Sequence, residues 1–374
     1  MFHSIQDKWH YPRNELCKKL VLSIQHNIIH SFTLFAPRRI GKTYFLNYDL
    51  KPALESQLGY QTIYFSFAEQ VGNHLEQFRK VLIESVDLGL FRRLKISEIS
   101  FSWCKISIKD GVDLYALSLL QLLSLLAHQA KNRSNSPGQV VLLLDEIQEL
   151  VNIQDSDGFI GELRTALDLN KSYIKVIFTG SSRDGLRKMF NDNKAPFFHF
   201  GTSLNMEPFG SDFTDYLADV YQNITGRLIN KVKLFEIFKR LNFVTLSIRE
   251  FIAHLIMCDC SIDEAYDSFE SEIISKNSYV KHWQSFSTPV QLVLFGIANN
   301  YSALYSEAFY SFIKETFNIN ITQGKIQNSI NRLLKSGVIH ENDAEAYEID
   351  DTFLARWITI RRDDIITMLR DRNA

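Results

Sequence analysis

The sequence predicts an α/β protein with a parallel sheet in its first half and a mainly helical second half. Continuous apolar runs at Val140–Asp145 and Lys175–Gly180 are typical of strands buried on both faces of a parallel sheet. Stretches of helical periodicity separate the strands, and this alternation indicates an α/β sheet. From Asp212 the strand signal fades, and helical periodicity dominates to about Lys281.

The first elements follow from periodicity and turn signals. Apolar residues recur every four positions over 14–30 and predict an amphipathic helix, while 31–36 (SFTLFA) is a short apolar strand. A helix over 42–57 is expected to stop near Gly59. The segment 62–67 (TIYFSF) predicts a second buried strand.

The next stretch is helical with one interruption. Residues 73–93 show helical periodicity, and 96–108 alternate loosely, which predicts a hairpin or a pair of edge strands. A leucine-rich helix is expected over 110–129; its apolar part, 114–127, is shorter than the roughly 20 residues of a membrane span. We therefore expect no membrane association. A further helix is expected over 158–169.

The last part of the chain has a pattern of its own. Periodicity predicts helices over 289–299, 306–315 and 323–336, followed by the polar segment GVIHENDAEAYEID and a terminal helix.

Composition and charge exclude several classes of protein. A length of 374 residues predicts two or three domains. Lys and Arg number 41 against 43 Asp and Glu, so the net charge of -2 excludes a polybasic coat and gives no whole-chain attraction to nucleic acid or acidic membranes. Four scattered cysteines do not form a disulfide framework. They predict reduced thiols and, with no secretory signal, a cytoplasmic protein.

A phosphate-binding loop is indicated between the first strand and the following helix. Residues 36–43 (APRRIGKT) match the P-loop G-x-x-x-x-G-K-[ST], or Walker A motif, except that alanine replaces the first glycine. Gly41 lets the backbone approach phosphate, Lys42 reaches the β and γ phosphates, and Thr43 is expected to bind Mg²⁺. The residues expected around the phosphates are Pro37, Arg38, Arg39, Ile40, Gly41, Lys42, Thr43 and Tyr44.

Two further strands end in polar residues that complete this site. Asp145 follows VVLLL, as in a Walker B motif, and is expected to hold Mg²⁺, while Glu146 would orient the water that attacks the γ-phosphate. Thr179 and Ser181, at the end of KVIFTG, are candidate γ-phosphate sensors or plain strand-end caps. No N-K-x-D guanine-reading motif follows a suitable strand, which favours ATP over GTP.

These motifs resemble a known family. FAPRRIGKT, YFSFAE, VVLLLDEIQEL, KVIFTGSS and LLKSGVIH…YEIDDTFLARWI are similar to prokaryotic archaeal-type ATPases at the border of the AAA+ and STAND proteins, in order over roughly residues 10–362. The resemblance implies an ASCE-type P-loop NTPase core over residues 1–208, an α-helical lid over 209–286 and a C-terminal winged helix over 287–374.

The resemblance also implies roles for three arginines. Arg13 matches a family motif near the adenine, and Arg183 matches an arginine that acts on the γ-phosphate. Arg249 is the nearest match to a lid sensor, with a solvated helix arginine as the alternative. Two alternatives also stay open for Arg38 and Arg39: contact with phosphate or a neighbouring subunit, or solvation and pairing with acids elsewhere.

The winged helix leaves two kinds of partner open. Lys325, Arg332 and Lys335 on its third helix favour DNA contact in the major groove. Residues 288–374, however, hold nine Lys and Arg against eleven Asp and Glu, whereas a module dominated by phosphate contacts should be basic. Packing on a protein partner or on the ATPase core is the alternative.

The leading hypothesis is a slow, regulatory ATPase. Mg-ATP binding would switch the protein toward self-assembly or a partner protein, and hydrolysis would reset it; partner regulation, mobile-element or phage-defence biology and DNA transactions are the uses the family spans. The alternative is an ATP-regulated DNA-binding protein. A third hypothesis, an inert scaffold with a relic P-loop, is disfavoured by Glu146.

Overall fold

The computed structural model describes most of the chain. The described residues are 7–36, 38–68, 73–93, 98–100, 105–107, 112–132, 138–153, 156–181, 186, 189–190, 195, 197–275, 277–301, 303–341 and 346–372. The chain divides into two compact units: residues 12–36 with 41–207 form one, which we term the sheet unit, and residues 1–11, 37–40 and 208–374 form the other, the helical unit.

A five-stranded parallel sheet forms the centre of the sheet unit, in the order β2-β5-β6-β1-β7. Its strands are β1 (Ser31–Phe35), β2 (Gln61–Ser66), β5 (Val140–Asp145), β6 (Ile174–Gly180) and β7 (Thr202–Asn205). The middle strands β5 and β6 are buried throughout, as their apolar runs predict. Because β6 lies between β1 and β5, it separates the strand before the P-loop from the strand that ends in Asp145.

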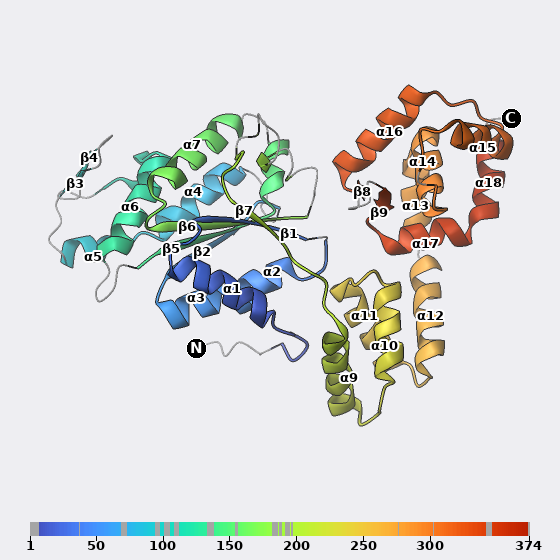
Figure 1. Ribbon diagram of the computed structural model, residues 1–374, viewed down its shortest axis with the longest axis horizontal. Helices are drawn as coiled ribbons and strands as arrows, with labels where there is room; N and C mark the ends of the chain where they lie inside the picture. The colour runs from blue at the N-terminus through green and yellow to red at the C-terminus, as the bar shows by residue number, and fades with distance from the viewer. Residues whose placement is uncertain are drawn as a thin grey trace. The chain divides into compact units, whose positions relative to one another are not determined.

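Helices cover both faces of this sheet (Figure 1). They are α1 (Asn14–Gln25), α2 (Lys42–Tyr44), α3 (Lys51–Leu58), α4 (His74–Glu84), α6 (Leu119–Asn132) and α7 (Ser156–Leu169). A further helix, α5 (Leu88–Arg93), packs its Phe91 with Leu125 of α6. A π-helical turn, η1 (Phe45–Leu50), joins α2 to α3, and a 3-10 turn, η3 (Ile147–Asn152), follows β5. The predicted fold class, a parallel sheet flanked by helices, is confirmed.

The structure corrects some element boundaries in the sheet unit. The helix expected over 110–129 begins only at Leu119, after a 3-10 turn, η2 (Leu114–Ala116). The edge strand β7 was not predicted, because it is short and mostly exposed and so carries no apolar run. The loosely alternating segment does form an antiparallel hairpin, with strands β3 (Glu98–Ser100) and β4 (Lys105–Ser107).

The described residues of the helical unit form two hydrophobic clusters. The first is formed mainly by α9 (Ser211–Thr225), α10 (Lys231–Arg240), α11 (Thr245–Met257) and α12 (Ile262–Ser275), with Trp9 and Tyr11 packed against it. Helix α13 (Asn277–Ser285) leads to the second cluster, which includes α14 (Thr288–Ala298), α15 (Glu307–Phe317), α16 (Gln323–Ser336), α17 (Thr352–Ile360) and α18 (Arg362–Asp371). An antiparallel hairpin, β8 (Ile339–Glu341) and β9 (Tyr347–Ile349), follows α16.

One expectation about the cysteines is wrong. Cys258 and Cys260 form a disulfide rather than two reduced thiols. The chain leaves α11 and turns before α12, which brings the two Cα atoms to 5.3 Å, within the range that a disulfide can bridge.

No helix in the described ranges is long and apolar enough to span a membrane.

Candidate nucleotide site

The phosphate loop of the sequence lies between β1 and α2. Gly41 has φ 96°, a left-handed conformation that favours glycine, and the chain enters the helix there without a side-chain cap. Lys42 is 5% exposed, and its Nζ donates a hydrogen bond of 2.8 Å to the carbonyl of Ala36 at the start of the loop. The lysine therefore spans the loop from its end to its beginning.

A carboxylate at the end of β5 faces the loop. Asp145 is 1% exposed and accepts hydrogen bonds at Oδ2 from Thr43 Oγ1 (2.7 Å) and the Tyr64 hydroxyl (3.1 Å). A hydroxyl and a carboxylate are the oxygen ligands that Mg²⁺ binds beside nucleotide phosphates. The convergence of Thr43 and Asp145 thus fits the predicted magnesium site.

Glu146 is held in one orientation. Its Oε2 accepts hydrogen bonds from Ser181 N (3.1 Å), Ser181 Oγ (2.7 Å) and Gln148 Nε2, while its Oε1 lies 3.7 Å from Lys42 Nζ. Burial raises the pKa of Glu146, but the charge of Lys42 and these hydrogen bonds outweigh burial, so the pKa lies below its ordinary value. The side chain is therefore a carboxylate at neutral pH.

The residues at the end of β6 contact both carboxylates. Thr179 is fully buried, and its hydroxyl donates to Asp145 Oδ1. Ser181 donates to Glu146, as described above. Both sensor candidates thus lie beside Asp145 and Glu146, which we term the acidic pair, because parallel strands place their carboxyl ends at one edge of the sheet.

Other predicted residues near the loop have mixed placements. Tyr44 is 39% exposed, and its ring lies 4.9 Å from that of Tyr48. Ile40 is buried. Pro37 and Arg183 lie outside the described residues.

Arg13 lies in the sheet unit beside Asp49. Its backbone N–H donates to Asp49 Oδ2 (2.9 Å), and its Nη1 donates to the carbonyl of Glu207 (2.6 Å). Burial lowers the pKa of Arg13 to about 10, against the opposing charge of Asp49, so the guanidinium stays charged at neutral pH.

The remaining arginines belong to the helical unit. Arg38 and Arg39 are exposed; the Arg39 carbonyl accepts hydrogen bonds from Thr245 Oγ1 (2.8 Å) and Leu246 N (3.3 Å), and its φ is 65°. Arg249 pairs with Asp7, with 3.1 Å between Nη2 and Oδ2. The contacts described for Arg39 and Arg249 are made with protein groups, so the predicted roles of these arginines toward phosphate stay predictions.

Three residues at the site were not predicted. Tyr64 contacts Asp145, Gln148 contacts Glu146, and Gly180 lies against Gln148. Gln148 stands two positions after Glu146 in DEIQEL, a signal that the sequence offered. Tyr64 lies inside a buried strand, where a tyrosine is indistinguishable from a core residue.

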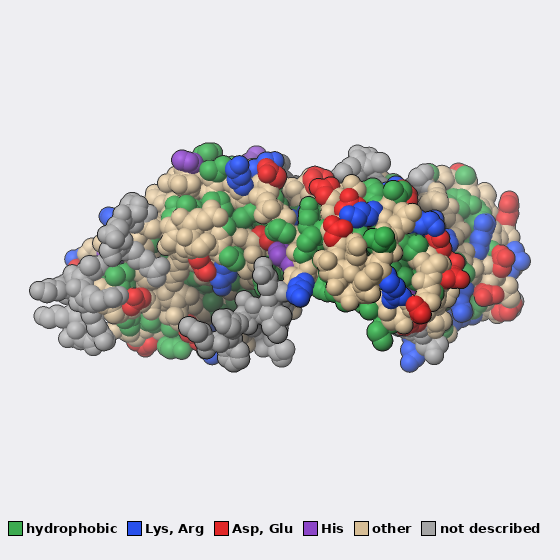
Figure 2. Space-filling model, turned by 90° about the horizontal axis from the view of Figure 1, so that it is seen from below, with side chains coloured by type: hydrophobic (Ala, Val, Ile, Leu, Met, Phe, Trp, Pro, Cys, Tyr) green, Lys and Arg blue, Asp and Glu red, His purple; other side chains and the backbone are tan. Residues whose placement is uncertain are grey.

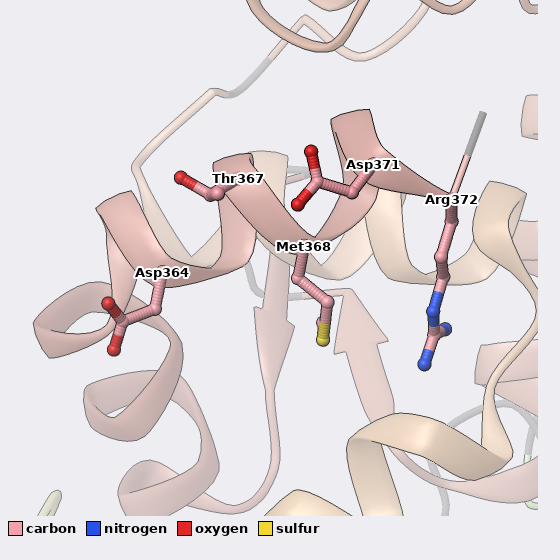
Figure 3. Close-up of a pocket in the computed structure, with 5 residues that line it drawn as sticks. All are labelled: Asp364, Thr367, Met368, Asp371 and Arg372. Carbon is pink, nitrogen blue, oxygen red and sulfur yellow. The ribbon is translucent and has the colours of Figure 1, made fainter. Parts of the chain in front are cut away.

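Two surface pockets lie elsewhere. One, of about 310 Å³ in the sheet unit, is lined by Thr33, Phe190, Phe197, Phe198, His199, Gly201 and Ser203. The other, of about 520 Å³, is lined by Asp364, Thr367, Met368, Asp371 and Arg372 of α18 and its end, and Figure 3 shows Met368 and Arg372 pointing to the same side of the helix. The described lining residues of neither pocket include a predicted nucleotide residue.

Comparison with known proteins supports the class that the fold and loop indicate. A family model described as an AAA domain matches residues 30–190. A Walker-type ATPase of Pyrococcus abyssi is similar with a TM-score of 0.67 and 17% identity, over 94% of this chain and 96% of that chain. No curated protein matches the chain.

A second solved structure is similar over nearly its whole length. The Aeropyrum pernix ORC2 protein, in ADPNP-ADP complexes, has a TM-score of 0.59 and 11% identity, over 97% of this chain and 98% of that chain. At these identities the likeness shows the fold. Residues 30–190 are thus similar to an AAA domain, and the chain shares the fold of these two solved structures.

Proposed function

We propose that this protein binds Mg-ATP and hydrolyses it slowly, as a molecular switch. The observation that carries the proposal is the convergence of Lys42, Thr43, Asp145 and Glu146 at one edge of the sheet, and the match of this region to an AAA-domain model supports it. The regions 209–286 and 287–374 are proposed as lid and winged helix.

The side chains divide the chemistry between them. When nucleotide binds, Lys42 leaves its contacts with the Ala36 carbonyl and Glu146 and contacts the β and γ phosphates instead. The backbone at Gly41 lets the phosphates approach closely. Thr43 and Asp145 hold Mg²⁺, which when bound neutralises charge on the phosphate oxygens. Glu146 orients the attacking water and accepts its proton.

The binding half of this proposal is tested by Lys42→Ala. We expect ATP-analogue affinity to fall about tenfold or more, since one hydrogen bond to a charged group contributes ~1.5–3 kcal/mol. Titration calorimetry measures the loss, and Lys18→Ala, an exposed lysine on α1, is the matched control. Unchanged affinity in Lys42→Ala would refute the site.

The hydrolytic half is tested by Glu146→Gln. The substitution keeps the size of the side chain but removes the proton acceptor, so we expect nucleotide affinity to be retained and phosphate release to fall roughly 100-fold or more. Turnover equal to that of the wild type would rule out Glu146 as the base.

The switch is tested by measuring particle size. We expect Mg-ATP to change the assembly state or partner binding of the wild type transiently and of Glu146→Gln persistently. Light scattering with chromatography, with and without Mg-ATP, detects self-assembly. If neither form changes size or retains a partner, the switch fails while nucleotide binding can still stand.

A second candidate function is ATP-regulated DNA binding through the proposed winged helix. Helix α16 buries Ile326, Ile330 and Leu333 and leaves Lys325, Arg332 and Lys335 exposed, so one polar face carries three cations. Residues 288–374, however, hold nine Lys and Arg against eleven Asp and Glu, and on the face drawn in Figure 2 the two kinds of charge are mixed. Such mixing weakens a purely electrostatic attraction to phosphate.

Salt-dependent duplex binding decides between the two functions. A DNA-binding protein should show affinity that falls with salt, and replacing all three α16 cations by alanine should reduce the slope of log affinity against log salt by about 3. The absence of duplex binding at low ionic strength, with and without ATP, would eliminate this candidate.

A further inference from the structure

Gln148 is buried at the acidic pair although it has no assigned role. It lies in the η3 turn after β5 and is 4% exposed. Its Nε2 donates to Glu146 Oε2, whereas its Oε1 is buried without a hydrogen-bond partner in the described part of the chain. A buried acceptor without a partner costs free energy, so this amide is a poor choice for stability alone.

The contacts around Glu146 divide its two oxygens. Gln148 and Ser181 supply three donors to Oε2, and Oε1 is left facing Lys42. The backbone of Glu146 has φ 52°, a left-handed conformation that is costly for a residue with a side chain. Strain of this kind persists only where surrounding contacts fix it, and it is concentrated at functional sites.

Gly180 makes room for Gln148. A Cβ added at position 180 would lie 2.4 Å from Gln148 Oε1 and 2.8 Å from a methyl carbon of Leu186. An alanine at position 180 would therefore force the Gln148 amide and the Leu186 side chain to shift. Gly180, at the end of β6, thus lies against Gln148 in the η3 turn, and Gln148 in turn contacts Glu146.

We propose that Gln148 is a positioning residue for Glu146. Its amide, together with Ser181, fixes Oε2 of Glu146 so that Oε1 faces Lys42 Nζ, the group that we expect to contact the phosphates. A carboxylate with one anchored oxygen presents the other in a single direction, as an oriented water requires. The inference rests on the proposed ATPase function, and it assigns to Gln148 an effect on turnover rather than on nucleotide affinity.

The first test is Gln148→Met, which keeps the approximate volume of the side chain and removes both the N–H donor and the carbonyl acceptor of the amide. We expect the turnover number to fall roughly tenfold or more, the effect of losing one hydrogen bond to a charged group. Nucleotide Kd should stay within about twofold, and the thermal midpoint should be unchanged or higher, because the unpartnered acceptor is also gone. A purely structural glutamine would instead lower the midpoint and weaken binding.

Adding Gln148→Met to the Glu146→Gln variant distinguishes an effect of Gln148 that acts through Glu146 from an effect that is independent of it. If Gln148 acts through Glu146, residual turnover in Glu146→Gln should not fall further when Gln148→Met is added. A full additional loss would overturn the proposal. If the wild type itself shows no turnover, it is the proposed ATPase function that fails; wild-type turnover with an unaffected Gln148→Met refutes only the positioning role.

A second variant displaces Gln148 without altering it. Gly180→Ala should lower turnover as Gln148→Met does, and the two changes together should be less than additive, because both act on one contact. Gly161→Ala is the matched control, since an added Cβ there meets nothing within 4 Å. Additive losses in the Gly180/Gln148 pair would contradict the shared route.

Discussion

At the scale of single residues, the contacts of Asp145 fix the orientation of the buried carboxylate that we propose as a ligand of Mg²⁺. Tyr64 and Thr43 both donate to its Oδ2, and Thr179 donates to Oδ1. Thr43 is the metal ligand in our proposal, so Tyr64 and Thr179 remain to orient the carboxylate when Thr43 turns to the ion. Groups that orient a ligand in this way contribute to metal affinity without touching the metal.

Tyr64→Phe tests this orientation. We expect the Mg²⁺ concentration needed for ATP binding to rise about tenfold, the effect typical of losing a partner of a metal ligand. Metal-free nucleotide binding should not change. Tyr60→Phe, directly before the same strand, is the control; equal effects of the two substitutions would show that Tyr64 has no special role.

Whether a site residue could be predicted from the sequence depended on whether its role requires a fixed spacing from a strand end. Lys42, Thr43, Asp145 and Glu146 were predicted because backbone and phosphate chemistry demand those residue types at fixed distances from a strand end. Gln148 and Gly180 were not, because their importance lies in a contact between two strand ends. Such contacts depend on side-chain directions in the fold, which periodicity does not give.

At the scale of elements, the start of α6 illustrates a local signal that outweighs periodicity. Apolar residues before Leu119 suggested a longer helix, but Ser118 and Gln121 form a capping box: Ser118 N donates to Gln121 Oε1 (2.8 Å), and Gln121 N donates to Ser118 Oγ (3.2 Å). The pair S-x-x-Q stands in the sequence and marks the true helix start. Strands β5 and β6, by contrast, were predicted within one residue because their burial leaves no competing pattern.

Ser118→Ala measures this cap. We expect the free energy of unfolding to fall by about 1 kcal/mol, since the N-cap oxygen satisfies an otherwise unpaired helix N–H. Urea denaturation is the measurement. Ser56→Ala, at an exposed position inside α3, should change stability little or slightly raise it, and a comparable loss there would indicate a general effect of removing serine.

At the scale of the whole molecule, the two compact units allow the switch to be localised. Nucleotide at about 100 times its Kd stabilises the state that binds it by ~2.7 kcal/mol. In Glu146→Gln with Mg-ATP, we expect slower amide hydrogen exchange in β1, β5 and β6. If the protein works as a switch, Mg-ATP must also change the rate of amide hydrogen exchange in residues 208–374, in either direction. Changes confined to the sheet unit would indicate binding without communication.

The place of β6 in the sheet has a consequence for how the chain tolerates change. Thr179 reaches Asp145, Ser181 reaches Glu146, and Gly180 between them admits Gln148, so three successive positions serve three different neighbours. Conservative replacements among the apolar residues of β6 leave that alignment intact. A one-residue insertion or deletion before Thr179 would exchange all three positions at once, so the length of this segment is under tighter constraint than its composition.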